Sequence, residues 1–249
     1  MAPHILPLPC AQPADAPSQA PSWAPLPRRG GWGKRGRPIT EVAMPEDARP
    51  QIYLITPPAF DLETFPDQMA RVLDAHEVAC LRLALATTDA DAVSRAADAL
   101  REIAHARDIA LVVGEHVQLV EKLGLDGVHL GDGPRRVRKT REALGAETIV
   151  GAFCTASRHD GITAGDAGAD YVAFGPVGAT GLGDGTQAPH ALFEWWSDMI
   201  EVPVVAEGAL DAATMRALAP VVDFFAIGEE IWRSDDPTGS LAALIAAME

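Results

Sequence analysis

The charged residues of this chain that could do chemistry stand at the ends of short apolar runs. Glu115 follows the run A-L-V-V-G, and Asp132 follows the run G-V-H-L-G. Two carboxylates at neighbouring strand ends could together hold Mg²⁺, which prefers oxygen ligands and keeps several of its waters. Either residue could instead be an acidic side chain at the start of a helix, where the helix dipole favours negative charge.

Two other polar residues lie inside apolar runs. Arg82 interrupts the run C-L-R-L-A, and a buried arginine needs a partner. It therefore either holds an anionic ligand or pairs with an internal carboxylate such as Glu115. His129 alternates with Val128 and Leu130, which is typical of a hydrogen-bonded core residue, although a histidine there could also act as a general acid or base.

Glycines end several of the apolar runs. Gly208 and Gly228 follow two late runs, and such glycines could offer backbone N–H groups to a phosphate or could simply make tight turns. The segment G-P-V-G-A-T-G-L-G-D-G (residues 175–185) has five glycines and contains Thr180 and Gly181. It is either a loop that wraps a ligand or a flexible surface loop.

The elements that position these residues follow a repeat of strand and then helix. Continuous apolar runs are typical of parallel strands that are covered on both faces. Eight strands are predicted: Ile52–Ile55, Ala79–Leu83, Ala110–Val113, Gly127–Leu130, Ile149–Phe153, Tyr171–Phe174, Val202–Ala206 and Phe224–Ile227. Eight such repeats predict an α/β fold of the TIM (β/α)₈ barrel type, with ligands at the carboxyl ends of the strands. A doubly wound open sheet is the alternative, although no G-x-G-x-x-G follows the first strand.

Amphipathic stretches between these runs predict the helices. Thr88 is expected to cap one in which Val93, Ala97, Leu100 and Ile103 share a face. The others are expected at residues 61–75, 116–123, 135–144, 157–167, 189–198, 211–218 and 241–248. No H-x-x-x-H, C-x-x-C or G-x-S-x-G pattern occurs, which argues against a structural zinc site or a serine hydrolase.

Four motifs, in order and spacing, make the chain resemble the thiamine phosphate synthase family from Ile52 to Ile231. They are Y-L-I-T (residues 53–56), D-G-V-H-L-G (126–131), G-A-D-Y-V-A-F-G-P (168–176) and V-P-V-V-A-E-G (202–208). The resemblance implies a TIM barrel that joins a hydroxymethylpyrimidine pyrophosphate to a thiazole phosphate, with Mg²⁺ and release of pyrophosphate. It also implies the site residues. Arg82 would be catalytic, Arg82, His129, Thr180, Gly181, Gly208 and Gly228 would bind the phosphorylated substrates, and Glu115 and Asp132 would bind the metal.

The sequence departs from the family where the chemistry is done. Ala84 and Gly183 stand where the family has lysines, and Gly114-Glu115 replaces an Asn-Asp pair. A site that must hold a leaving pyrophosphate has thus lost at least two cations. We therefore expect a thiamine phosphate synthase-like transferase with reduced or altered activity. A non-catalytic or repurposed barrel that binds a small phosphorylated ligand or a protein partner is the alternative.

Composition separates residues 1–44 from the rest. They contain nine of the twenty prolines and five basic residues against two acidic ones, so they carry +3 and the remainder of the chain carries −18. A disordered basic extension is expected there, and Met44 is an alternative start. The barrel is expected to occupy residues 45–249. The five basic residues could contact nucleic acid, but without a folded context they are weak evidence for such a partner. No apolar run is long enough to cross a membrane.

The positions of the cysteines indicate the cellular compartment in which the protein is expected. Cys80 and Cys154 lie in strand-like runs, far from each other and from Cys10, which predicts buried free thiols in a reducing cytoplasm. Association with a second copy of the chain stays open.

Overall fold

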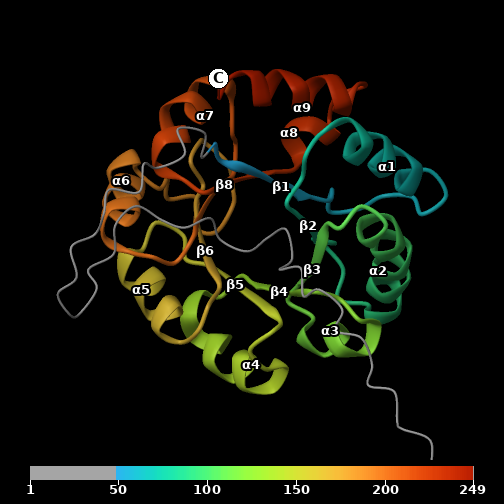
Figure 1. The fold of residues 1–249 in the computed structure, drawn as a ribbon, viewed down its shortest axis with the longest axis horizontal. Coiled ribbons are helices and arrows are strands. Elements are labelled where there is room, and N and C mark those ends of the chain that lie inside the picture. The colour runs from blue at the N-terminus through green and yellow to red at the C-terminus, as the bar shows by residue number, and fades with distance from the viewer. Residues whose placement is uncertain (1–48, 249) are drawn as a thin grey trace, which may run out of the picture.

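Eight parallel strands close into a barrel in the computed structural model, which describes residues 49–248. Each strand pairs with the next along the chain, and the last pairs with the first (Figure 1). The predicted TIM barrel is thereby confirmed, and the open sheet is excluded. The strands are β1 (Gln51–Ile55), β2 (Cys80–Leu83), β3 (Ala110–Gly114), β4 (Gly127–Leu130), β5 (Ile149–Phe153), β6 (Tyr171–Phe174), β7 (Val204–Glu207) and β8 (Phe224–Ile227).

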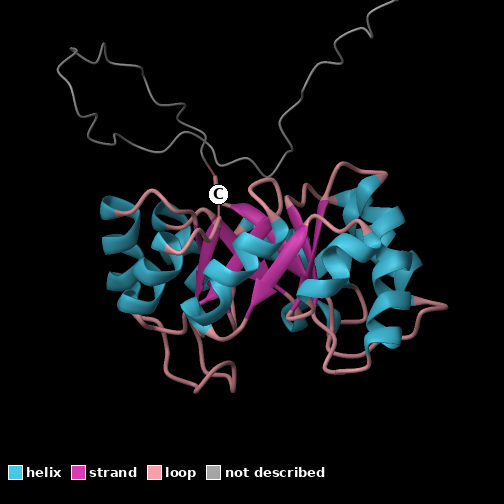
Figure 2. Cartoon of the chain, turned by 90° about the horizontal axis from the view of Figure 1, so that it is seen from below, coloured by secondary structure: helices cyan, strands magenta, loops and turns pink. Residues whose placement is uncertain are grey.

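Helices surround the strands on the outside, as the side view in Figure 2 shows. They include two short 3₁₀ segments, η1 (Gly133–Arg136) and η2 (Ala219–Val221). The α-helices are α1 (Phe65–Ala75), α2 (Ala90–His105), α3 (Val117–Leu123), α4 (Val137–Leu144), α5 (Arg158–Asp166), α6 (His190–Met199), α7 (Ala212–Leu218), α8 (Glu229–Trp232) and α9 (Pro237–Ala246).

Three local predictions need correction. Asp89, not Thr88, caps α2, because its carboxylate accepts the backbone N–H of Asp91. Strand β7 runs from Val204 to Glu207, whereas residues 202–206 were predicted. The proline before Val204 has no N–H to give to a sheet, and the extension at the other end brings Glu207 into the barrel wall. The short helix α8 was not predicted.

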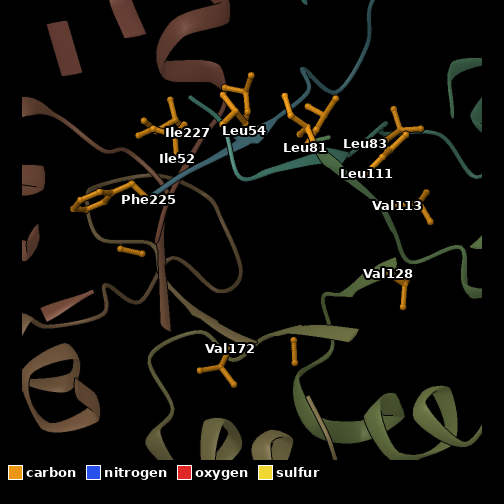
Figure 3. Packing of buried hydrophobic residues seen from close by; sticks show 14 of the residues in the cluster. Ile52, Leu54, Leu81, Leu83, Leu111, Val113, Val128, Val172, Phe225 and Ile227 are labelled. Atoms are coloured by element: carbon orange, nitrogen blue, oxygen red, sulfur yellow. The ribbon is translucent and has the colours of Figure 1, made fainter. Parts of the chain in front are cut away.

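Alternate residues of the strands face two different apolar layers. One set points outward to the helices and includes Leu54, Leu81, Val128 and Phe225, which are fully buried (Figure 3). The other set faces the inside of the barrel and forms a smaller separate cluster. Because both faces of every strand are buried, the strands read as continuous apolar runs in the sequence.

The inner layer combines very small residues with two tyrosines. Tyr53 on β1 and Tyr171 on β6 approach edge to face, with ring centroids 5.7 Å apart. A Cβ atom at Gly151 would overlap the ring of Tyr171 on the neighbouring strand. The absence of a side chain at Gly151 therefore lets Tyr171 lie across the interior of the barrel.

Two further findings concern the cysteines and the helices. Cys80 and Cys154 are both buried and free, as predicted. Within residues 49–248, no helix has the length and apolar character needed to cross a membrane. The expected extension of residues 1–44, with Cys10, lies outside the described residues.

Candidate active site

All of the predicted site residues lie at the carboxyl ends of strands or in the loops that follow them. Arg82 and His129 are the third residues of β2 and β4 and face the inside of the barrel, where each is about 6% exposed. Glu115 and Asp132 follow β3 and β4, and Gly208 and Gly228 follow β7 and β8. In the loop between β6 and α6, Thr180 and Gly181 are exposed. The rim of the barrel thus collects them, but their individual contacts differ from those expected.

Of the two alternatives for Arg82, the structure shows the pairing with an internal carboxylate, and the partner is Glu207 rather than Glu115. Its Nη1 donates to Oε2 of Glu207 at 3.1 Å, and its Nη2 donates to Oε1, so the two side chains form a bidentate ion pair. Burial alone would lower the pKa of Arg82, but the neighbouring carboxylate of Glu207 outweighs it and raises the pKa. The guanidinium also lies over the ring of Tyr53, 5.6 Å from its centroid. The charge of Arg82 is therefore already neutralised inside the barrel.

His129 belongs to a buried chain of hydrogen bonds. Its Nδ1 lies 2.9 Å from the hydroxyl of Tyr171, which lies 2.8 Å from the hydroxyl of Tyr53. Burial, helped by the charge of Arg82, holds the pKa of His129 well below its usual value. The imidazole is therefore neutral at physiological pH, and its contacts agree with a satisfied core residue.

The two carboxylates predicted to bind metal are bridged by a cation of the chain itself. Arg136, on η1, donates from Nη2 to Oε2 of Glu115 and from Nε to Oδ2 of Asp132, the latter at 2.6 Å. The other oxygen of Glu115 accepts the N–H of Gly131 at 2.6 Å. The hydrogen bond that Arg136 donates to Asp132 is the main reason that the pKa of Arg136 is raised.

This arrangement does not fit Mg²⁺. Three of the four carboxylate oxygens of Glu115 and Asp132 are engaged, which leaves Oδ1 of Asp132, buried and without a partner. Mg²⁺ needs near-octahedral oxygen ligands, and the guanidinium of Arg136 lies between the carboxylates that would supply them. Residues 49–248 also contain no group of three or more His, Cys, Asp or Glu side chains that could hold a metal ion.

The loops after β7 and β8 meet at a third carboxylate. Glu230, in the first turn of α8, accepts the N–H of Gly228 at 2.8 Å and the N–H of Leu210 at 3.2 Å. Gly208 has a φ of +91° and packs so closely on Pro176 that a Cβ atom there would lie 3.0 Å from the Cβ of that proline. The N–H groups expected to receive a phosphate are thus partly taken by Glu230.

No lysine lies at the rim in the described part of the chain. The lysines after residue 48 are Lys122, in the last turn of α3, and Lys139, exposed on α4. Ala84 and Gly183 occupy the positions where the family has lysines. Ala84 donates its N–H to Thr56, and Gly183 has a φ of +63°. Within residues 49–248, no lysine from another part of the sequence therefore replaces at the rim the two lysines that are missing there.

Sequence reasoning did not identify Glu207, Arg136 and Glu230 as the partners of the predicted residues. Glu207 is 125 positions from Arg82, and nothing local connects them. Arg136 stands four positions after Asp132, a spacing that places two side chains of one helix together, but the helix was predicted to begin at residue 135 and did not include Asp132.

Comparison with known proteins agrees with this architecture. A family model described as thiamine monophosphate synthase matches residues 52–231. The thiamine-phosphate synthase of Rhodospirillum centenum is 40% identical over 196 residues, which cover 78% of this chain and 94% of that protein. That of Erythrobacter litoralis is 37% identical over 193 residues, covering 75% and 90%.

Solved structures share the fold. The thiamine phosphate pyrophosphorylase from Pyrococcus furiosus superposes with a TM-score of 0.68 at 19% identity, covering 80% of this chain and 97% of that one. The 3-hexulose-6-phosphate synthase from Salmonella typhimurium gives a TM-score of 0.63 at 15% identity, covering 80% and 98%. From its sequence match over residues 52–231, the chain belongs to the thiamine monophosphate synthase family.

Proposed function

We propose that this protein is a transferase of the thiamine phosphate synthase type that works slowly because its charged groups are paired with one another. In this proposal it joins a hydroxymethylpyrimidine pyrophosphate to a thiazole phosphate. The family match over residues 52–231 supports the reaction type. The observation that carries the reduced rate is the bidentate pair of Arg82 with Glu207. A cation neutralised in the free protein stabilises a departing pyrophosphate less than a free one would.

The remaining rim residues are assigned by their positions. Thr180 and Gly181, on the exposed loop after β6, would close over the bound substrates, and Gly208 would let the backbone approach a phosphate. Gly228 could donate to a phosphate only after Glu230 turns away from its N–H. His129 is neutral and buried, so its proposed part is to position Tyr171 and the wall of the barrel rather than to transfer a proton.

Mg²⁺ has no step in this proposal, because Arg136 bridges Glu115 and Asp132. A cytoplasmic location is part of the proposal and is supported by the two buried free thiols, Cys80 and Cys154. Burial raises the pKa of Cys154 to about 12, so this thiol stays protonated and unreactive.

A second function is a barrel that binds a phosphorylated ligand or a protein partner without catalysis. It is favoured by the same pattern of internal pairing, which involves Arg82, Arg136 and the N–H of Gly228. The two functions differ in whether any product forms.

The test is to incubate the full chain with both family substrates, with and without Mg²⁺. Mass spectrometry then measures the thiamine phosphate that forms. We expect thiamine phosphate to appear at well below about 1 s⁻¹, the low end of ordinary enzyme turnover. Loss of a charge-stabilising donor costs about a hundredfold or more in rate, so Arg82→Ala should fall by at least that factor. Arg95→Ala, an exposed arginine on α2, is the matched control.

Three results would contradict parts of this proposal. Turnover near or above about 1 s⁻¹ would show that internal pairing does not limit the rate. Activity of folded Arg82→Ala equal to that of Arg95→Ala would remove Arg82 from the site. No product, together with saturable binding of either substrate, would favour the non-catalytic barrel.

A further inference from the structure

A cavity of about 290 Å³ lies at the end of the barrel opposite to the rim. It is lined where strands begin, by Tyr53, Cys80, Ile149, Asp170, Tyr171, Pro203, Val205 and Phe224. Cys80, Ile149 and Phe224 are the first residues of their strands. Family chemistry belongs to the carboxyl ends of the strands, so the function proposed above makes no use of this space.

Small residues and a tyrosine pair explain why the space is there. Cys80 is the only side chain that β2 contributes to the lining, and its neighbour on β3, Ala110, carries only a methyl group. Toward the rim, the hydroxyls of Tyr53 and Tyr171 bond to each other at 2.8 Å. Because these hydroxyls are already paired, the two tyrosines offer mainly ring surface to the cavity.

The polar groups of the lining are already engaged. Oδ2 of Asp170 accepts the N–H of Val150 at 2.7 Å and also binds Arg141, so this carboxylate is neutralised by the protein. Burial raises the pKa of the Cys80 thiol well above its usual value, so the thiol is uncharged. A charged ligand would lose its hydration here and find no partner in return, which is costly. An apolar ligand gains by leaving water.

We propose that this mouth of the barrel is a second ligand site, which binds a small, uncharged aromatic or aliphatic molecule. Its volume supports the size, because an apolar cavity of about 150 Å³ is enough to bind benzene. A single ring or two fused rings therefore fit within a lining that includes Tyr53, Tyr171 and Val205. The rim residues do not line this site, although Tyr53 and Tyr171 also contact Arg82 and His129.

The experiment uses the full chain and indole as the probe, and follows binding by calorimetry and by the rise of the thermal midpoint. Cys80→Met places a longer, adaptable apolar side chain in the space, whereas Cys80→Ala leaves it open. We expect saturable binding of indole to the wild type and to Cys80→Ala, and binding at least tenfold weaker in Cys80→Met. Indole-3-acetate, which adds a negative charge, should also bind at least tenfold more weakly than indole.

Cys154→Met is the matched control for stability. Cys154 is buried but does not line the cavity, so a longer side chain there should overpack the core and lower the thermal midpoint. Cys80→Met should keep the midpoint close to that of the wild type. Absence of saturable indole binding to the wild type, or equal affinity in folded Cys80→Met, would overturn the proposal. If Cys80→Met does not fold, Val205→Leu fills the space from β7 and must weaken binding in the same way.

Discussion

The two ends of the barrel differ in the groups that line them and in whether those groups already have partners. At the carboxyl ends of the strands, the charged groups that could meet a phosphorylated substrate are paired with other residues of the chain. At the amino ends, an apolar lining surrounds unfilled volume. At the carboxyl ends, where barrels of this type have their active sites, an ionic ligand must compete with ion pairs of the protein itself. At the amino ends, an apolar molecule can enter the cavity without breaking such pairs.

The rim itself contains two kinds of ion pair, which should behave differently. The side chains of Arg82 and Glu207 are 7% and 6% exposed, whereas those of Arg136 and Glu115 are 39% and 51% exposed. Removal of one partner of a buried pair leaves an uncompensated charge in the interior. An exposed pair is solvated when it breaks and contributes little. A ligand could therefore displace Arg136 far more easily than it could recruit Arg82.

The largest expected difference between the buried and the exposed ion pair is in their contribution to stability. We expect Glu207→Ala to lower the free energy of unfolding by about 3–5 kcal/mol, because Arg82 then stays buried without a partner. Arg136→Ala should cost less than about 1 kcal/mol. Denaturant titrations of both variants measure the difference.

Replacement of both buried partners controls for this result. In the double variant Arg82→Met with Glu207→Leu, no charge is left behind, so most of the stability should return. Equal losses in Glu207→Ala and Arg136→Ala would remove the distinction between the buried and the exposed pair.

A smaller effect concerns pH. His129 has a pKa lowered by burial and by the charge of Arg82, so the unfolded chain takes up a proton below about pH 6.5 that the folded protein does not. Stability should therefore fall as the pH is lowered from 7 toward 5, by at most about 1.4 kcal/mol per pH unit from this group. His129→Asn should remove that part of the slope.

His159 on α5, which is exposed, provides the control, since His159→Asn should keep the slope of the wild type. Unfolding free energies measured at several pH values test this directly. Equal slopes of unfolding free energy against pH for the wild type and His129→Asn would contradict the account. They would mean that His129, hydrogen-bonded to Tyr171 and through it to Tyr53, takes up a proton as readily in the folded protein as in the unfolded chain.

The sequence was sufficient for the fold but not for the partners of the site residues. Continuous apolar runs predicted all eight strands, because parallel strands buried on both faces leave that signature. The predicted β7 ended at Ala206, whereas the strand extends to Glu207, whose side chain binds Arg82 inside the barrel. Arg82 and His129 were expected at strand ends and lie there, yet their contacts come from β7 and β6, far along the chain. Such contacts depend on the closure of the barrel, which no local pattern encodes.

Binding of Mn²⁺, a spectroscopic substitute for Mg²⁺, tests the central claim that the charged groups of the rim are paired with one another. The wild type and two variants would be titrated and followed by electron paramagnetic resonance. Arg136→Gln removes the bridge between Glu115 and Asp132, and Arg135→Gln removes the same charge from an exposed neighbour. The account predicts that Arg136→Gln binds Mn²⁺ at least tenfold more tightly than the wild type and Arg135→Gln. Equally tight binding by all three proteins, or no gain in Arg136→Gln, would contradict it.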